Sequence, residues 1–131
     1  MKFYLLLISL MLLGCGGSSG SDTPKQAENT PPVLAFESTY SSNEQTAIEL
    51  SVDATDDKGI ASYAWQQISG KSVALSNTNE SKLSFITPTV LMSEGEQALE
   101  FEVLVTDNEG ATSKASFEVN VKAVNSLPDV T

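Results

Sequence analysis

Two alternating segments near the end of the chain constrain its fold more than any other feature. Residues 98–106 and 112–122 each alternate between apolar and polar side chains, and the sequence Asp-Asn-Glu-Gly at 107–110 separates them. Alternation with a period of two puts the apolar side chains on one face of a β-strand. A short turn rich in Asp, Asn and Gly between two such strands is typical of a β-hairpin. These residues therefore predict an antiparallel hairpin that buries one face.

Shorter segments repeat this pattern through residues 29–124. Apolar alternations occur at 33–36, 47–54, 62–68 and 82–87, with a further short segment at 73–75. No stretch shows helical periodicity, so the sequence predicts an all-β fold: a two-sheet antiparallel β-sandwich of about seven strands. Tyr40, which polar residues follow, is expected in a loop. The expected core is aromatic: Tyr63, Trp65, Phe85, Phe101 and Phe117.

The first fourteen residues form a predicted export signal. Lys2 precedes an apolar run at 3–13 that only Ser9 interrupts. This run is too short to span a bilayer, which takes about 20 residues, and is typical of a signal peptide. The sequence Leu12-Leu13-Gly14-Cys15 that ends it resembles the lipobox of bacterial lipoproteins. The alternative is an ordinary signal peptide followed by an unrelated cysteine.

The lipobox resemblance implies that residues 1–14 are removed and that lipid is attached covalently to Cys15. Two or more acyl chains hold a protein stably on a membrane, whereas one chain does not. Gly16, in place of Asp, resembles the outer-membrane sorting signal of Gram-negative lipoproteins. We therefore expect an exported protein that is lipid-anchored to a bacterial membrane, in a Gram-negative host the outer membrane.

Two short segments flank the predicted domain. Residues 15–28 are rich in Gly and Ser and then polar, and this composition predicts a flexible tether because it cannot bury enough apolar surface to fold. Residues 125–131 include Asn-Ser-Leu-Pro-Asp-Val, which partly repeats Asn-Thr-Pro-Pro-Val at 29–33. They are therefore interpreted as a C-terminal linker or the start of a next repeat. A coincidental polar tail is the remaining alternative.

The charge composition excludes several classes of function. The 131 residues include 17 acidic residues and 7 basic ones, all lysines, with no histidine and a formal net charge of −10. Nucleic acid is excluded as a partner because phosphate neutralisation needs Lys and Arg. Because the chain has no histidine, and its only cysteine, Cys15, is expected to carry lipid, Ser-His-Asp and Cys-His catalysis are excluded, and we expect no enzymatic activity. The charge fits either a solubilising acidic surface or a cationic partner.

Several further motifs follow one another along the predicted domain. They are Asp57-Lys58-Gly59-Ile60 with Tyr63-Ala64-Trp65, Gln66-Gln67-Ile68-Ser69-Gly70 with Val73-Ala74-Leu75, Phe85-Ile86-Thr87-Pro88, Leu99-Glu100-Phe101, and Val105-Thr106-Asp107-Asn108-Glu109-Gly110. Together they resemble a PKD-type Ig-like domain of the REJ or cadherin-like variety, over nearly all of residues 29–123. The resemblance implies an Ig-like antiparallel β-sandwich. The chain lacks the Gly-Asp-Gly turn that follows the tryptophan in many PKD domains, which favours the REJ-like branch.

The resemblance also implies a non-catalytic role as an adhesion, protein-interaction or spacer module, with a cell-surface protein or a polysaccharide as partner. The alternative is a carbohydrate-binding accessory module of a polysaccharide-degrading system. A carbohydrate-binding module is expected to expose a row of aromatic side chains. The sequence has few aromatic residues outside the predicted core, and this favours the spacer.

Acidic residues gather in two predicted turns. In an Ig-like sandwich the loop between the second and third strands and the loop between the sixth and seventh lie at the same end, beside the start of the domain. We therefore expect Asn29 to lie near five carboxylates: Asp53, Asp56, Asp57, Asp107 and Glu109. Ca²⁺ takes about six to eight oxygen ligands, and is therefore the candidate cofactor. The alternative is that these residues occur here because turns require them.

Overall fold

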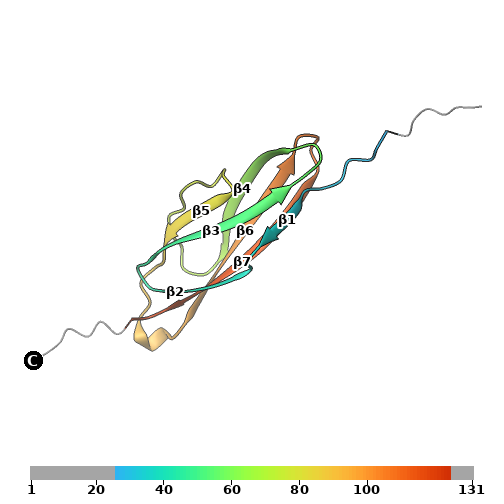
Figure 1. Ribbon diagram of the computed structural model, residues 1–131. Helices are drawn as coiled ribbons and strands as arrows, with labels where there is room; N and C mark the ends of the chain where they lie inside the picture. Colours follow the sequence, from blue (N-terminus) through green and yellow to red (C-terminus); the bar gives the residue numbers. More distant parts are fainter. Residues whose placement is uncertain (1–25, 125–131) are drawn as a thin grey trace, which may run out of the picture.

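Seven strands and one short 3₁₀ helix make up the computed structural model, which describes residues 26–124 (Figure 1). The elements are β1 (Val33–Phe36), β2 (Thr39–Asn43), β3 (Ala47–Thr55), β4 (Ile60–Ser69), β5 (Lys82–Ile86), η2 (Met92–Glu94), β6 (Gln97–Asp107) and β7 (Thr112–Lys122). The predicted all-β class is confirmed. The expected signal peptide, residues 1–14, and the segment 125–131 lie outside the described residues, as does most of the expected tether. No helix in the described part is long and apolar enough to cross a membrane.

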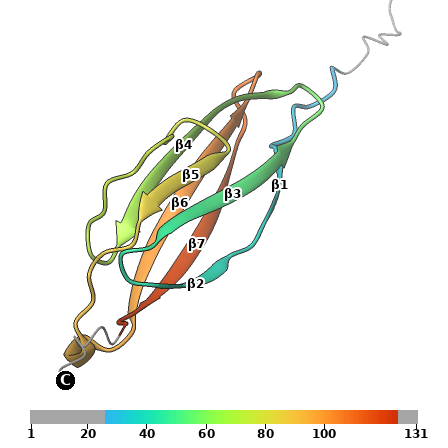
Figure 2. The same ribbon diagram turned by 60° about the vertical axis from the view of Figure 1, so that its left-hand side comes forward.

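The strands form two sheets that face each other (Figure 2). One sheet has the order β1-β3-β5 and the other β2-β7-β6-β4. The predicted hairpin is β6 and β7, which pair antiparallel from Gln97↔Val121 to Thr106↔Thr112. All neighbouring pairs among the described strands are antiparallel except β2 and β7, which run parallel. The antiparallel sandwich is therefore confirmed, with one parallel pair at the edge of the larger sheet.

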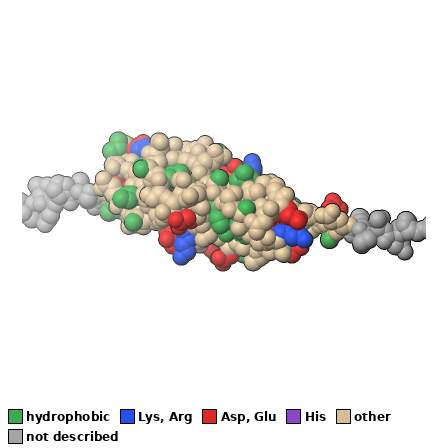
Figure 3. Space-filling view, turned by 90° about the horizontal axis from the view of Figure 1, so that it is seen from above, with side chains coloured by type: hydrophobic (Ala, Val, Ile, Leu, Met, Phe, Trp, Pro, Cys, Tyr) green, Lys and Arg blue, Asp and Glu red, His purple; other side chains and the backbone are tan. Residues whose placement is uncertain are grey.

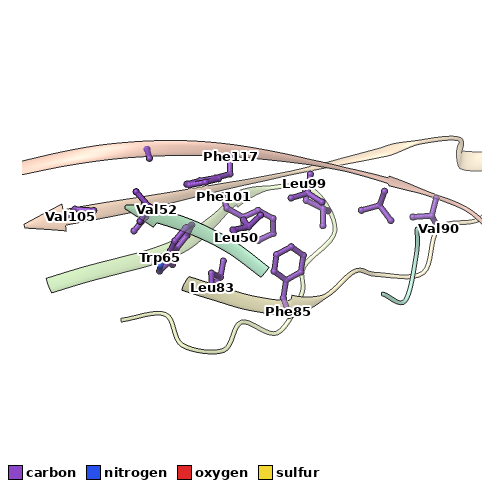
Figure 4. Close-up of a cluster of buried hydrophobic side chains, with 14 residues drawn as sticks. Leu50, Val52, Trp65, Leu83, Phe85, Val90, Leu99, Phe101, Val105 and Phe117 are labelled. Atoms are coloured by element: carbon purple, nitrogen blue, oxygen red, sulfur yellow. The ribbon is translucent and has the colours of Figure 1, made fainter. Parts of the chain in front are cut away.

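The core lies between the two sheets (Figure 4). Each strand of the hairpin turns one side of its alternation inward, so that Phe101 and Phe117 are buried and meet side chains from the smaller sheet. The Phe85 and Phe101 rings lie 4.6 Å apart between centroids. Trp65 is buried as well and lies 5.1 Å from Phe117. Tyr63 is half-buried at the margin of this cluster.

Trp65 also holds the connection between β4 and β5. Its indole Nε1 donates a hydrogen bond to the Glu80 carbonyl at 2.7 Å, and its main-chain amide donates to the Thr78 carbonyl at 2.9 Å. A buried indole N–H needs such a partner. Further back in the same connection, Ser76 exchanges two main-chain hydrogen bonds with Ser84 of β5. The expected strand at 73–75 is therefore reduced to a single bridge at Ser76.

The prediction that Tyr40 lies in a loop is wrong. Tyr40 belongs to β2, which pairs in parallel with β7 over five residues. Main-chain hydrogen bonds extend this pairing, from the Glu118 amide to the Ser38 carbonyl at 2.8 Å and from the Glu44 amide to the Lys122 carbonyl at 2.9 Å. The half-buried Tyr40 ring packs against the core. Pairing to β7, and not apolar alternation within β2, makes this segment a strand.

Replacing Trp65 with Ala should destabilise the domain by about 3–5 kcal/mol, because a large side chain is removed from a close-packed core. Urea denaturation followed by circular dichroism measures the change in the free energy of unfolding. The matched control is Ile68→Ala in the same strand, whose side chain is 52% exposed and whose loss should change stability by no more than about 0.5 kcal/mol. Equal losses in the two variants would contradict the assignment of Trp65 to the core.

Candidate functional site

The candidate site is the N-terminal pole, which we define as Asn29–Pro32 together with the turns 56–59 and 107–110. Asn108 joins the two turns, because its side-chain amide donates to the Lys58 carbonyl at 2.7 Å and its main-chain amide donates to the Gly59 carbonyl at 3.1 Å. Gly59 has a φ of +86°, and a Cβ there would lie 2.8 Å from the Asn108 side chain. Glycine is therefore required for this close approach.

Asp107 is the buried centre of the N-terminal pole, with only 1% of its surface exposed. One carboxylate oxygen accepts a hydrogen bond from the Asn29 side-chain amide at 2.9 Å. The other accepts from the amides of Glu109 at 2.7 Å and Ala111 at 2.9 Å. Burial raises the pKa of Asp107, but the hydrogen bonds from Asn29, Glu109 and Ala111 outweigh it, so that the pKa lies below its ordinary value of 3.8. Both oxygens are therefore committed to structure.

The first strand is fastened to the same pole. Ser113, at the start of β7, donates its hydroxyl to the Pro32 carbonyl at 2.6 Å. Together with the bond from Asn29 to Asp107, this contact ties the segment before β1 to the β6–β7 hairpin. The start of the described chain is therefore held against the larger sheet, although β1 itself pairs with the smaller one.

The structure does not gather the five predicted carboxylates into one cluster. Asp53 is exposed in β3, opposite Ala35 of β1. Asp56 accepts a hydrogen bond from the Lys58 amide at 2.7 Å within its own turn. Asp57 and Glu109 are exposed. Among residues 26–124, no group of three or more His, Cys, Asp or Glu side chains is placed to hold a metal ion.

Two features of the N-terminal pole still bear on cation binding. Asp56 and Asp57 line a surface hollow that Thr30 and Pro31 also line. The Asn29 side-chain oxygen is buried and has no hydrogen-bond partner within the described part of the chain. A buried acceptor without a partner is uncommon in proteins. The oxygen atoms that could serve a cation are thus those of Asn29, Asp56 and Asp57, because Asp107 is occupied.

The surface formed by residues 26–124 lacks the aromatic row expected of a carbohydrate-binding module. Within the described residues, Phe36 is the only exposed aromatic side chain, at 41% exposure. Its ring packs on Phe117 with a centroid distance of 5.0 Å. On the face shown in Figure 3, acidic and basic side chains are scattered among uncharged ones.

Sequence reasoning missed the residue that organises the opposite end, Glu44. Its two carboxylate oxygens accept hydrogen bonds from the amides of Val90 and Val124, each at 2.9 Å. These bonds are the largest influences on Glu44 and lower its pKa below the ordinary value. Glu44 sits in a turn, where an acidic residue is unremarkable. Its partners lie far along the chain, so no local pattern pointed to this role.

Comparison with models of known protein families identifies the family of this chain. The family model described as K319L-like, PKD domain, matches residues 41–121. The chain belongs to this family. The earlier resemblance to a PKD-type Ig-like domain is thereby confirmed, and with it the Ig-like sandwich. PKD domains are non-catalytic modules, which supports the expectation that this one is not an enzyme.

Several solved structures share the fold of this domain at low sequence identity. The PKD domain from KIAA 1837 protein is 24% identical, with a TM-score of 0.60, covering 88% of this chain and all of that one (100%). A nucleoside hydrolase-related hypothetical protein from Saccharophagus degradans is 17% identical, with a TM-score of 0.57, covering 75% of this chain and 26% of that one. The sialic acid binding region of a Streptococcus sanguinis adhesin is 15% identical, with a TM-score of 0.55, covering 73% of this chain and 31% of that one. No curated protein matches the chain.

Replacing Asp107 with Asn should lower the melting temperature by about 5 °C or more at neutral pH, because several hydrogen bonds to a buried carboxylate weaken. The lowered pKa means that ionised Asp107 favours folding above its unfolded value, and that this contribution is lost as the pH falls through the folded value. The difference between wild type and Asp107→Asn should therefore shrink below about pH 4.

Thermal unfolding followed by circular dichroism between pH 2 and 7 measures this dependence. Asp57→Asn is the matched control, because Asp57 is exposed in the neighbouring turn and should leave the melting temperature nearly unchanged. A pH-independent difference between wild type and Asp107→Asn would contradict a role for the ionised carboxylate.

Proposed function

We propose that the chain is a membrane-anchored lipoprotein whose PKD domain is a non-catalytic spacer and protein-interaction module at a bacterial surface or in the periplasm. The observation that carries the spacer role is the path of the chain. The described residues begin at the N-terminal pole and end at the opposite end of an elongated sandwich, where β7 finishes (Figure 1). Strands of 11 residues such as β6 and β7 span about 35 Å. The first and last described residues are thus separated by the full length of the sandwich.

The pairing of the terminal strands supports a spacer under tension. β2 and β7 run parallel, so forces that pull the two ends of the domain apart slide one strand along the other. The hydrogen bonds between the strands lie across this direction and are loaded together. β1, which pairs with β3, is loaded in the same manner. A module that links a membrane to a distant contact benefits from such an arrangement.

The anchor is proposed from the sequence at Cys15, which lies outside the described residues. A thioether-linked lipid together with a second acyl group would hold the protein on a membrane. The outer membrane is the proposed location in a Gram-negative host. The chain enters the sandwich through Asn29, which bonds to Asp107, so a lipid at Cys15 would be joined to the domain through the N-terminal pole.

Calcium at the N-terminal pole is a narrower proposal. The unpartnered oxygen of Asn29 and the hollow beside Asp56 and Asp57 support it. Thermal unfolding in calcium and then in EDTA measures it, because a ligand at a hundredfold excess over its dissociation constant adds about 2.7 kcal/mol. The resulting rise in melting temperature should be absent in Asp57→Ala and kept in Glu49→Ala, whose carboxylate lies in β3. Equal melting temperatures in calcium and EDTA would end the calcium proposal.

A protein partner is preferred here to a polysaccharide. The Streptococcus sanguinis structure is a sialic acid binding region, and at 15% identity the likeness concerns the fold. The single exposed aromatic side chain among the described residues, Phe36, does not provide the stacking row that sugar rings require. The spacer and protein-interaction role therefore has the stronger physical support.

The anchor predicts that a fatty-acid label is incorporated at Cys15. Cells that express the full chain are fed an alkyne-bearing palmitate analogue, and the label on the purified protein is measured after coupling to a dye. Cys15→Ser should lose the label. The matched control carries Cys15→Ser together with Ser19→Cys, which moves the thiol out of the lipobox and should also remain unlabelled. Undiminished labelling of Cys15→Ser would rule out this anchor.

The spacer role predicts resistance to pulling that depends on the β2–β7 pairing. Every second amide of an edge strand points to its one partner, and the Glu44 amide bonds to Lys122. The Ser42 amide therefore points to β7 and the Ser41 amide points away. Ser42→Pro should lower the unfolding force measured by single-molecule pulling between the two ends, and Ser41→Pro should lower it less. Equal forces in wild type and Ser42→Pro would remove this support for load bearing.

A further inference from the structure

The end of the domain away from the N-terminal pole, where β7 finishes, exposes several apolar side chains. Leu91 is 60% exposed, Met92 is 65% exposed and Val124 is 43% exposed. We call these three residues the C-terminal patch. Glu44 brings them together, because its carboxylate binds the amide of Val90, which precedes Leu91, and the amide of Val124. Glu44 therefore brings the backbone on either side of the patch to a single carboxylate, although the two segments are far apart in the sequence.

The loop that carries Leu91 and Met92 is held firmly by polar contacts. The Lys71 ammonium donates to the Thr89 carbonyl at 3.0 Å and to the Glu94 carboxylate at 2.8 Å. The same Glu94 carboxylate accepts from the Leu91 amide at 2.7 Å. Thr87 is buried, and its hydroxyl donates to the Asn43 carbonyl at 2.7 Å.

These polar contacts hold the exposed side chains in place, so that they form a preorganised surface. Apolar side chains on a loosely held loop could turn inward, whereas here the contacts of Glu44, Lys71 and Glu94 fix the backbone that presents them. A rigid apolar surface lowers the entropic cost of binding. Exposed apolar groups that lie side by side commonly mark a contact with another segment or molecule.

The size and position of the C-terminal patch indicate its occupant. Three partly exposed side chains present far less than the roughly 800 Å² per partner that a stable protein interface buries. They suit a short peptide segment. The chain continues from Val124, whose amide shares the Glu44 carboxylate with the amide of Val90, into residues 125–131, whose first apolar residue is Leu127. Three residues can span about 10 Å, so Leu127 is within reach of the patch.

We propose that the C-terminal patch is the docking surface for residues 125–131 of the same chain, with Leu127 covering Leu91 and Met92. Docking gives the chain one direction as it leaves the domain. Whatever is joined beyond this point is then carried at a set angle to the sandwich and does not swing freely. The proposal concerns the C-terminal end alone and does not depend on the lipid anchor or on the spacer role.

Met92 offers a direct probe, because the full chain contains only two other methionines, Met1 and Met11. The full chain is prepared in detergent micelles with ¹³C-labelled methionine methyl groups, and Met92→Leu identifies the Met92 signal. Nuclear Overhauser contacts between the Met92 methyl and Leu127 methyl protons are measured, together with the Met92 chemical shift. The variants are Leu127→Ser, a chain ending at Val124, and Thr131→Ala as the matched control.

The proposal expects a Met92–Leu127 contact that is unchanged on tenfold dilution. It also expects the Met92 shift to move in Leu127→Ser and in the shortened chain but not in Thr131→Ala. A contact seen only between differently labelled molecules would assign the patch to a second copy and overturn the proposal. An identical Met92 shift in the full and shortened chains, without a contact to Leu127, would also overturn it. Circular dichroism of each variant verifies that the sandwich is folded.

Discussion

The contact of Trp65 with Phe117 is the interaction on which the rest of the sandwich depends. Both residues belong to the larger sheet, and together they fill the space under the smaller one. The indole N–H also holds the β4–β5 connection through Glu80, so one side chain links core packing to the course of a long loop. A domain of this size has a small margin of stability.

The periodic part of the fold could be predicted from sequence, because burial on one face of a strand forces alternation. The hairpin of β6 and β7 and the aromatic centre around Trp65 follow from this rule. β2 could not be predicted in this manner. Its polar residues Ser41 and Asn43 show no apolar period, and it is a strand because β7, far along the sequence, supplies main-chain partners. Local patterns carry no information about such pairing.

The candidate site shows the same limit in chemical terms. Turn composition predicted acidic residues at one end of the domain, but it could not tell which carboxylates remain available. Both Asp107 oxygens are occupied, by Asn29 and by amides of the adjoining turn, whereas Asp56 has only one oxygen occupied, by the Lys58 amide. At the other end, Leu91 and Met92 are apolar yet exposed, which residue type alone does not indicate. In both cases the outcome depends on contacts between distant segments.

The connection between β4 and β5 has a consequence for how these molecules coexist at high density. Through Thr78 it bonds to the outer edge of β4, and through Ser76 it bonds to the outer edge of β5. This one connecting segment therefore supplies hydrogen-bond partners to backbone groups at the edges of both sheets, on the same side of the sandwich. Free sheet edges invite strands from neighbouring molecules and lead to aggregation. A protein crowded among copies of itself is protected on this side by its own loop.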